Sequence, residues 1–468
     1  MNILEYMQEH LIYLDGGMGT LLQSAGMQAG ELPERRNITH PNDIVAIHRA
    51  YYDAGSHIVN TNTFGANTLK YSVEELQAII PAAVANARTA AEQSSAPQQK
   101  FIALDIGPLG RLIKPYGTME FDEAVAIFAT TVRIGTACGV DLVTIETMND
   151  SLETKAALLA VKENCDLPVF VSNAYGADGK LMTGADPIAM IAMLEGLGAD
   201  AIGINCSLGP KQMQSVVEKY LAYASIPVLI KPNAGLPRCE GDCTYYDVAP
   251  DEFAALMREF VQMGARVVGG CCGTTPDYIA ALHRATADLP LVKKEEIEKT
   301  MIGSYNHGVI FDEIPVAIGK SVDPLTNASV MTALQNEDID SIIDEAFEDV
   351  AQGARVLQIC VAADGINEND ILCEVVKELQ TVINIPLWIH TNSASALERA
   401  LRAYNGKAMI SAADHTVLTL DTLLPAAKKY GAVVALECEG AESLSIVKQA
   451  GIRQADVLIV NEKTVEYV

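Results

Sequence analysis

The segment ARVVGGCCGTTPDYIAAL, residues 265–282, joins a short β-branched run to a helical pattern through two adjacent cysteines. Cys271 and Cys272 directly follow the apolar run and have glycines on both sides. A third cysteine, Cys206, follows another apolar run in AIGINCSLGP, residues 201–210. Three thiolates gathered at strand ends make a soft metal site with one open position. That arrangement suits a zinc ion that binds and activates a substrate thiol.

Short apolar runs alternate with amphipathic stretches from the N-terminus to about residue 285. Several of the helical stretches begin with Pro or an N-cap residue and end at glycine. Eight strands, each followed by a helix, predict a (β/α)₈ TIM barrel. An open doubly wound sheet is the alternative, but no G-x-G-x-x-G turn supports it. The predicted strands are Ile12–Gly16, His57–Asn62, Phe101–Gly107, Asp141–Thr147, Pro168–Asn173, Ala201–Asn205, Pro227–Asn233 and Arg266–Cys271.

Each of these predicted strands ends in polar or thiol side chains. Active sites of such barrels lie at the C-terminal strand ends, so we expect these side chains to share one mouth. Strands six and eight belong to the same alternating set, which allows their cysteines to converge. A cysteine pair alone is more typical of buried structure, but the third cysteine and the glycines favour a metal site. The residues are Asp15, Asn60, Asn62, Asp105, Glu146, Asn173, Cys206, Asn233, Cys271 and Cys272.

Composition narrows the class of protein. The formal net charge of −27 makes nucleic acid an unexpected partner, and solubility explains the charge without any basic partner. No apolar run approaches the length of a membrane span, and the N-terminus does not resemble a signal peptide, so we expect the cytoplasm. Cys239 and Cys243, four residues apart in PRCEGDCTYY, suggest a second metal site, but we favour a turn-rich loop.

Eight segments together resemble the homocysteine S-methyltransferase family, in the right order and from about residue 10 to 285. The resemblance implies zinc on Cys206, Cys271 and Cys272, with the sulfur of homocysteine as fourth ligand and methionine as product. The segments are LDGGMGT (14–20), NTNTFGAN (60–67), DIGPLGRL (105–112), DLVTIET (141–147), LMTGADP (181–187), GINCSLGP (203–210), KPNAGLP (231–237) and GGCCGTTP (269–276).

The same resemblance implies a set of substrate-binding residues. Asp15 and Glu146 carry over as the acidic groups that take part in binding the amino acid. Backbone amides around Gly16 and Gly17 are expected to supply donors for its carboxylate. Asn62 is expected among the substrate-binding residues, and Asn205 and Asn233 are expected to support the site through hydrogen bonds. Many relatives have Glu where this chain has Asn60.

The second half predicts another α/β unit. We expect domains at 1–288 and 305–468, with the charged segment 289–304 as a linker or bridging helix. Roughly six strands are too few for a full barrel, which indicates an incomplete, TIM-barrel-like domain. The predicted strands are Pro315–Gly319, Arg355–Cys360, Pro386–His390, Lys407–Ser411, Ala432–Glu437 and Asp456–Val460.

This second unit loosely resembles the pterin-binding barrel of methionine synthase. The carboxylate that should hold the N–H edge of the pterin is missing, and Asn327, Asn392 and Asp414 are the possible substitutes. Binding of methyltetrahydrofolate is therefore one hypothesis. The alternative is a domain that docks a partner or braces the first barrel.

The methyl donor is left open by the motifs. No D-x-H-x-x-G run occurs and no cobalamin-binding domain follows before Val468, so we expect methylcobalamin on a separate corrinoid protein. A second hypothesis is a small sulfonium or ammonium donor such as S-methylmethionine or betaine. A third is a non-catalytic zinc or thiol sensor, or a scaffold for a corrinoid protein. The presence of Asp15 and Glu146 favours catalysis.

Overall fold

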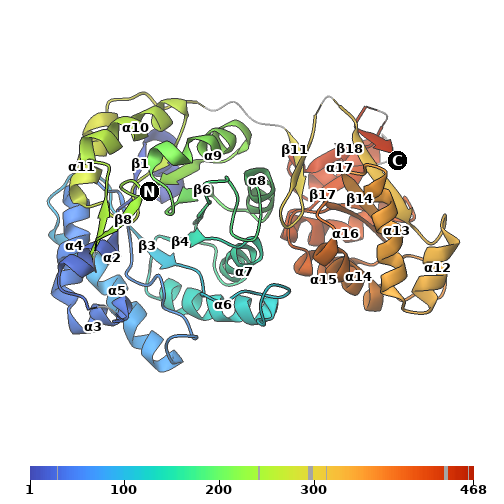
Figure 1. The fold of residues 1–468 in the computed structure, drawn as a ribbon, viewed down its shortest axis with the longest axis horizontal. Helices are drawn as coiled ribbons and strands as arrows, with labels where there is room; N and C mark the ends of the chain where they lie inside the picture. Colours follow the sequence, from blue (N-terminus) through green and yellow to red (C-terminus); the bar gives the residue numbers. More distant parts are fainter. Residues whose placement is uncertain (29, 241–242, 294–298, 313, 437–440, 462) are drawn as a thin grey trace. The chain divides into compact units, whose positions relative to one another are not determined.

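The computed structural model describes residues 1–28, 30–240, 243–293, 299–312, 314–436, 441–461 and 463–468 (Figure 1). The chain forms two compact units. The first contains Met1–Thr183 and Ala199–Glu295, and the second contains Gly184–Gly198 and Glu296–Val468. None of the helices in the described part of the chain combines the length and hydrophobicity that a membrane span requires.

Eight parallel strands form the predicted barrel, in the order β1-β10-β7-β6-β5-β4-β3-β2. The amide of His57 donates to the carbonyl of Tyr13 at 2.7 Å, which brings the two edge strands together and nearly closes the barrel. The first and last strands are shorter than predicted, because their glycine-rich ends leave the ladder. The strands are β1 (Ile12–Tyr13), β2 (Ile58–Asn60), β3 (Phe101–Ile106), β4 (Leu142–Met148), β5 (Val169–Asn173), β6 (Ala201–Asn205), β7 (Val228–Lys231) and β10 (Val267–Val268).

A helix follows each strand, and five of these helices begin with Pro, whose fixed φ suits the first helical turn. The eight are α4 (Pro41–Asp53), α5 (Val73–Gln93), α6 (Phe121–Ala137), α7 (Ser151–Lys162), α8 (Pro187–Gly196), α9 (Pro210–Tyr223), α10 (Pro250–Met263) and α11 (Pro276–Thr286). Two connections carry additional elements. They are α2 (Met18–Ser24), η1 (Pro33–Arg35) and α3 (Arg36–Thr39) after β1, and the hairpin β8 (Pro237–Glu240)–β9 (Cys243–Tyr246) after β7.

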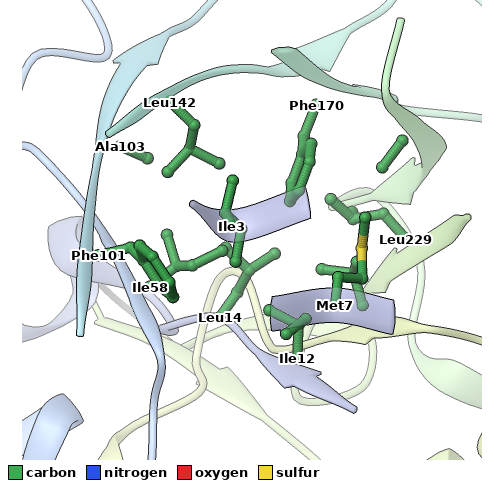
Figure 2. Close-up of a cluster of buried hydrophobic side chains, with 12 residues drawn as sticks. Ile3, Met7, Ile12, Leu14, Ile58, Phe101, Ala103, Leu142, Phe170 and Leu229 are labelled. Atoms are coloured by element: carbon green, nitrogen blue, oxygen red, sulfur yellow. The ribbon is translucent and has the colours of Figure 1, made fainter. Parts of the chain in front are cut away.

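The N-terminal end of the barrel is closed by helix α1 (Ile3–Glu9). Its Ile3 and Met7 side chains point into the barrel and pack against the first residues of the strands, including Ile58 and Leu142 (Figure 2). A capping box between Asn2 and Glu5 starts the helix. Burial of this apolar layer leaves only the opposite end of the barrel open for polar chemistry.

The second unit is an incomplete barrel of seven parallel strands, in the order β18-β17-β16-β15-β14-β13-β19. All six predicted strands are present; the seventh, β19, is short and was not predicted. The strands are β13 (Val316–Val322), β14 (Val356–Cys360), β15 (Leu387–Thr391), β16 (Met409–Ala412), β17 (Val433–Leu436), β18 (Val457–Ile459) and β19 (Val465–Tyr467). The helices are α12 (Ala328–Gln335), α13 (Ile339–Ala351), α14 (Glu368–Val382), α15 (Ala394–Ala403), α16 (Val417–Tyr430), α17 (Ala441–Gln449) and η2 (Gln454–Asp456).

An antiparallel hairpin, β11 (Thr300–Gly303) and β12 (Gly308–Phe311), precedes this sheet. Its Ile302, Val309 and Phe311 join the apolar core with Trp388. The strand β11 lies inside the segment that the sequence predicted as a linker. Because its apolar side chains enter the core of the second unit, the β11–β12 hairpin belongs to that unit, and the linker prediction was wrong for residues 300–303.

Candidate metal centre and acceptor pocket

The three predicted cysteines meet at the open end of the barrel. Their Sγ atoms all lie within 4.8 Å of one another. The Sγ atoms of Cys206 and Cys272 are 3.8 Å apart. Zinc binds thiolates at about 2.3 Å, so two ligands of a tetrahedral site are about 3.8 Å apart. The spacing and chemistry of this donor set therefore fit a tetrahedral zinc ion with one position left for another ligand.

The loop after β6 holds Cys206 in an unusual backbone conformation. Cys206 and the next residue, Ser207, have φ values of 59° and 57°. Residues other than glycine avoid this left-handed region, and such strain gathers at functional sites. The amide of Cys206 donates to the carbonyl of Lys231 at 3.1 Å, which ties this loop to the end of β7.

The loop after β10 is fixed from the neighbouring strand β7. The amide of Cys271 donates to the carbonyl of Pro232 at 2.9 Å. The amide of Cys272 donates to Oδ1 of Asn233 at 3.1 Å. Gly273 has a φ of 80°, and a Cβ atom there would lie 2.3 Å from the ring of Tyr246. Glycine is required at this position by both the backbone angle and the aromatic ring.

The thiols resist ionisation in the absence of a cation. The pKa of Cys206 is raised to about 12, first by its hydrogen bond with Cys271 and also by burial. The pKa of Cys272 is raised to about 11, first by its hydrogen bond with Cys206 and also by burial. Nearby thiolates repel one another in a site that excludes water.

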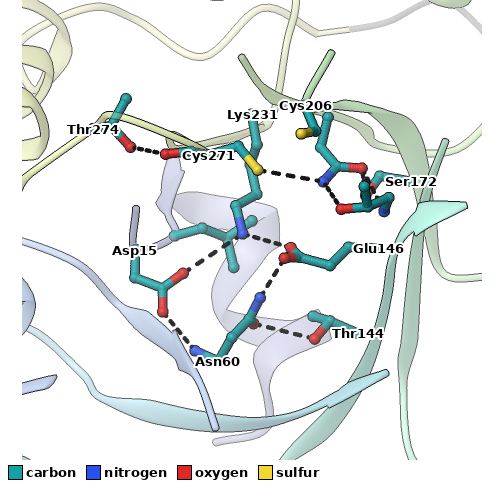
Figure 3. Close-up of polar contacts among 12 residues, drawn as sticks. Asp15, Asn60, Thr144, Glu146, Ser172, Cys206, Lys231, Cys271 and Thr274 are labelled. Carbon is teal, nitrogen blue, oxygen red and sulfur yellow. Dashed lines mark hydrogen bonds and ion pairs between the residues drawn. The ribbon is translucent and has the colours of Figure 1, made fainter. Parts of the chain in front are cut away.

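Beneath the thiols lies a buried ion cluster centred on Lys231 (Figure 3). The Nζ atom of Lys231 is 2.6 Å from Oε2 of Glu146 and 3.5 Å from Oδ1 of Asp15. Asn60 donates its amide N–H to Oδ2 of Asp15 at 2.8 Å and its side-chain Nδ2 to Oε2 of Glu146 at 3.0 Å. Strands β2, β4 and β7 and the segment just after β1 therefore contribute to one network.

Burial and charge oppose each other in this cluster. Burial is the main cause that raises the pKa of Asp15 to about 6, although Lys231 acts in the other direction. Burial and the charge of Glu146 raise the pKa of Asp105 well above its usual value. Burial lowers the pKa of Lys231, but Glu146 and Asp15 outweigh it, and the net shift is upward. Lys231 is therefore positively charged at neutral pH.

The two predicted supporting residues, Asn205 and Asn233, contact the cysteines of the candidate metal centre. Asn205 donates from Nδ2 to Oγ1 of Thr147 at 2.7 Å and lies 3.8 Å from Sγ of Cys271. Its Oδ1 accepts from Ser172 at 2.9 Å, so the amide is held in one orientation. Asn233 fixes the amide of Cys272, as described above. Both side chains shape the surroundings of the thiols.

Other predicted residues have local partners. Asn62 donates from Nδ2 to the carbonyl of Pro33 at 2.8 Å and to Asn37 at 3.2 Å, away from the ion cluster. The amide of Gly17 donates to the carbonyl of Thr274 at 3.0 Å, so it is not free for a carboxylate. Gly16 also lies against Thr274, where a Cβ atom would be 2.7 Å from that carbonyl.

Two central members of the cluster were given no binding role by the sequence analysis. Lys231 was quoted in KPNAGLP without a role, and Asn60 was predicted to lie at the barrel mouth and noted for its difference from relatives. Lys231 ends the apolar strand VLIK, and a lysine at such a position inside a barrel is a signal that could have identified it. Asn60 contacts the carboxylates of both Asp15 and Glu146. These residues come from three different parts of the sequence, so no local sequence pattern could have predicted the contact.

The three polar residues considered for pterin binding serve local structure. Asn327 caps α12 and donates from Nδ2 to Glu345 at 2.8 Å. Asp414 accepts a hydrogen bond at 2.6 Å from Oγ1 of Thr419, which lies in the first turn of α16. Oδ1 of Asn392 accepts from the amide of Asp414 at 2.9 Å. The side chains of Cys239 and Cys243 lie outside what the structure describes.

Comparison with known proteins agrees with the fold of the first unit. A family model described as homocysteine S-methyltransferase matches residues 12–286, which is more than half of the chain. The chain belongs to the homocysteine S-methyltransferase family. The matched region contains all eight barrel strands and all three cysteines of the candidate metal centre.

The curated relatives include the methionine synthases of Mycobacterium leprae and Mycobacterium tuberculosis. Each is 28% identical to this protein, and the matched region covers 88% of the chain described here. The chain spans 36% of the length of these relatives. A solved structure, the metallated form of the homocysteine methyltransferase MmuM from Escherichia coli, is 22% identical with a TM-score of 0.52. It covers 61% of this chain and 99% of its own, and it supports the fold of the first barrel.

Proposed function

We propose that this protein transfers a methyl group to the thiol of homocysteine and forms methionine. The observation that carries the proposal is the cluster of three thiols at the open end of a barrel that belongs to this methyltransferase family. Cys206, Cys271 and Cys272 would hold a zinc ion. A zinc ion bound there would keep the acceptor sulfur deprotonated and electron-rich at neutral pH.

The residues around the thiols would orient the acceptor. The carboxylates of Asp15 and Glu146 would attract its ammonium group. Asn205 holds its amide toward Cys271, and Asn233 holds the loop of Cys272, so both keep the thiols in position. Such supporting contacts fix metal ligands and tune their basicity. We place Gly16, which lies against the loop of Cys271 and Cys272, in the wall of the pocket.

For the donor, we propose methylcobalamin carried by a separate corrinoid protein. The similarity to methionine synthases extends over 88% of the chain and so includes the second unit. The MmuM structure covers only 61% of the chain. A second unit shared with methionine synthases favours a donor that needs a docking surface over a small sulfonium or ammonium donor.

The cysteines are tested by zinc content and by homocysteine-dependent demethylation of free methylcobalamin. Wild-type protein should bind about one zinc ion per chain and consume methylcobalamin only when homocysteine is present. Cys272→Ala should lose both properties, because two thiols seldom retain a tetrahedral zinc ion. Cys165→Ala, which changes a thiol between α7 and β5, is the matched control. If Cys272→Ala kept both zinc and activity, the proposal would be wrong.

The donor is tested separately. If the protein formed methionine from S-methylmethionine or betaine and did not turn over methylcobalamin, the small molecule would be the donor in place of methylcobalamin. Inactivity with every donor, together with capture of a purified corrinoid protein, would identify a scaffold. For the second unit we propose docking, and titration with methyltetrahydrofolate should give no measurable heat. A measurable heat of binding would restore the pterin hypothesis.

A further inference from the structure

The acceptor pocket contains a cation of its own. Lys231 is paired with Glu146 and Asp15, the two carboxylates that the proposed function assigns to the ammonium group of homocysteine. The side chain of Lys231 is only 3% exposed. Its charge is therefore fixed beside the carboxylates and is not spread into solvent, where it would be screened.

The lysine leaves hydrogen-bond acceptors unused. Within the described part of the chain, Oδ1 of Asp105 is buried and has no hydrogen-bond partner, and Oδ1 of Asp15 has only the 3.5 Å ion pair with Lys231. Buried acceptors of this kind are costly unless a partner reaches them. A second ammonium group brings three N–H donors, so the pocket still offers it partners. Figure 3 shows Asp15 and Glu146 on opposite sides of the Lys231 ammonium, below Cys271.

The charge balance explains what the lysine changes. Asp15 and Glu146 together contribute two negative charges, and Lys231 cancels one of them. A thiol amino acid brings a carboxylate close to its ammonium group, and two uncompensated carboxylates in the pocket would repel it. Charge pairs a few ångströms apart interact strongly where water is excluded. A thiol amine has no carboxylate and would gain from a more negative pocket.

We propose that Lys231 is a specificity-determining residue that adapts the pocket to zwitterionic thiol amino acids and disfavours thiol amines. This inference rests on the proposed function, because it assumes that the acceptor thiol binds beside the three cysteines. It assigns Lys231 a role through charge at the amino-acid end of the acceptor. It assigns Lys231 no role in the transfer of the methyl group.

Calorimetric binding to the zinc-loaded protein tests the inference without any turnover. The ligands are L-homocysteine, 3-mercaptopropylamine, which lacks the carboxylate, and 4-mercaptobutyrate, which lacks the ammonium group. In Lys231→Met, the ratio of the Kd of the amine to the Kd of the butyrate should fall at least tenfold relative to wild type. Lys231→Arg keeps the charge, and its ratio should stay within threefold. Zinc content is measured for each protein.

A second variant, Lys231→Gln, keeps the test decisive if Lys231→Met fails to fold, since methionine leaves two buried carboxylates without a counter-ion. Glutamine also removes the positive charge, but it keeps an N–H donor for Glu146. The ratio in Lys231→Gln should likewise fall at least tenfold relative to wild type. A ratio within threefold of wild type in zinc-loaded Lys231→Gln would contradict the charge argument.

The two levels of proposal fail in different ways. If wild-type protein binds homocysteine and Lys231→Met leaves the ratio unchanged, the inference about Lys231 is wrong and the proposed function stands. If zinc-loaded wild-type protein does not bind homocysteine, the proposed function itself is wrong, and the inference falls with it.

Discussion

At the scale of single residues, close backbone contacts position the metal centre. Gly203 lies in β6 opposite Leu229 of β7, and a Cβ atom there would be 1.8 Å from the carbonyl oxygen of Leu229. Rotation of a side chain cannot relieve this overlap, because the atom in the way is a backbone oxygen. The loop of Cys206 depends on the same strand pair.

We therefore expect Gly203→Ala to lower the thermal unfolding midpoint by several degrees and to reduce zinc content. The strands β6 and β7 would have to separate, and Cys206 would move with them. Gly19→Ala is the control, since a Cβ atom at Gly19 has open space within helix α2. That change should raise stability slightly, by about 0.5 kcal/mol or more. Equal midpoints for the two variants would contradict the steric argument.

A buried histidine predicts how the stability of the barrel depends on pH. His48 is fully buried in α4, and among the described residues neither ring nitrogen has a hydrogen-bond partner. Burial lowers its pKa to about 4. The unfolded chain therefore binds a proton below about pH 6.5 that the folded state does not bind, and stability is lost as pH falls from 6.5 toward 4.

The variant His48→Leu tests this linkage. Each buried neutral histidine contributes a slope of about 1.4 kcal/mol per pH unit within that window. The thermal midpoint of the variant should therefore fall less than that of wild type between pH 6.5 and 4.5. Between pH 7 and 8.5, the two midpoints should differ by a constant amount. Parallel curves across the acidic range would show that His48 does not titrate on unfolding.

At the scale of elements, helix α1 acts as the floor of the first barrel. Ile3 is 1% exposed and packs within the layer that closes the N-terminal end of the strands. Removing most of a buried aliphatic side chain costs about 2 to 5 kcal/mol. Ile3→Ala should therefore destabilise the barrel by that amount, measured by chemical denaturation. The exposed Gln8→Ala on the same helix should change stability by less than about 0.5 kcal/mol.

At the scale of the whole molecule, each unit has an apolar core and should unfold with its own transition. The second unit contains a buried ion pair between Lys407 and Asp456, and Arg453 donates from Nε to Asp456 at 2.7 Å. Burial raises the pKa of Asp456, but Lys407 and Arg453 outweigh it, and the net shift is downward. The carboxylate therefore stays ionised, and its contribution is lost only as pH falls below its usual value.

Asp456→Asn should lower the transition of the second unit, because it leaves the buried ammonium of Lys407 without a counter-ion. Such a loss costs about 3 to 5 kcal/mol. The expected shift should be the same from pH 5 to 8 and should leave zinc content unchanged. Glu398→Gln breaks an exposed pair with Lys429 and should cost less than about 1 kcal/mol. If calorimetry showed that Asp456→Asn lowers the unfolding temperatures of both units together, the claim that each unit unfolds independently would be wrong.

The sequence by itself determined the eight-stranded barrel, the six main strands of the second unit, and the convergence of Cys206 with Cys271 and Cys272. Periodicity, glycine and proline positions are local, and the C-terminal ends of barrel strands always share one mouth. Only the tertiary structure decided the ion pairs of Lys231, whose carboxylate partners are Asp15, just after β1, and Glu146 in β4. Such ion pairs join residues far apart in the chain, and burial, which no local pattern records, gives them their strength.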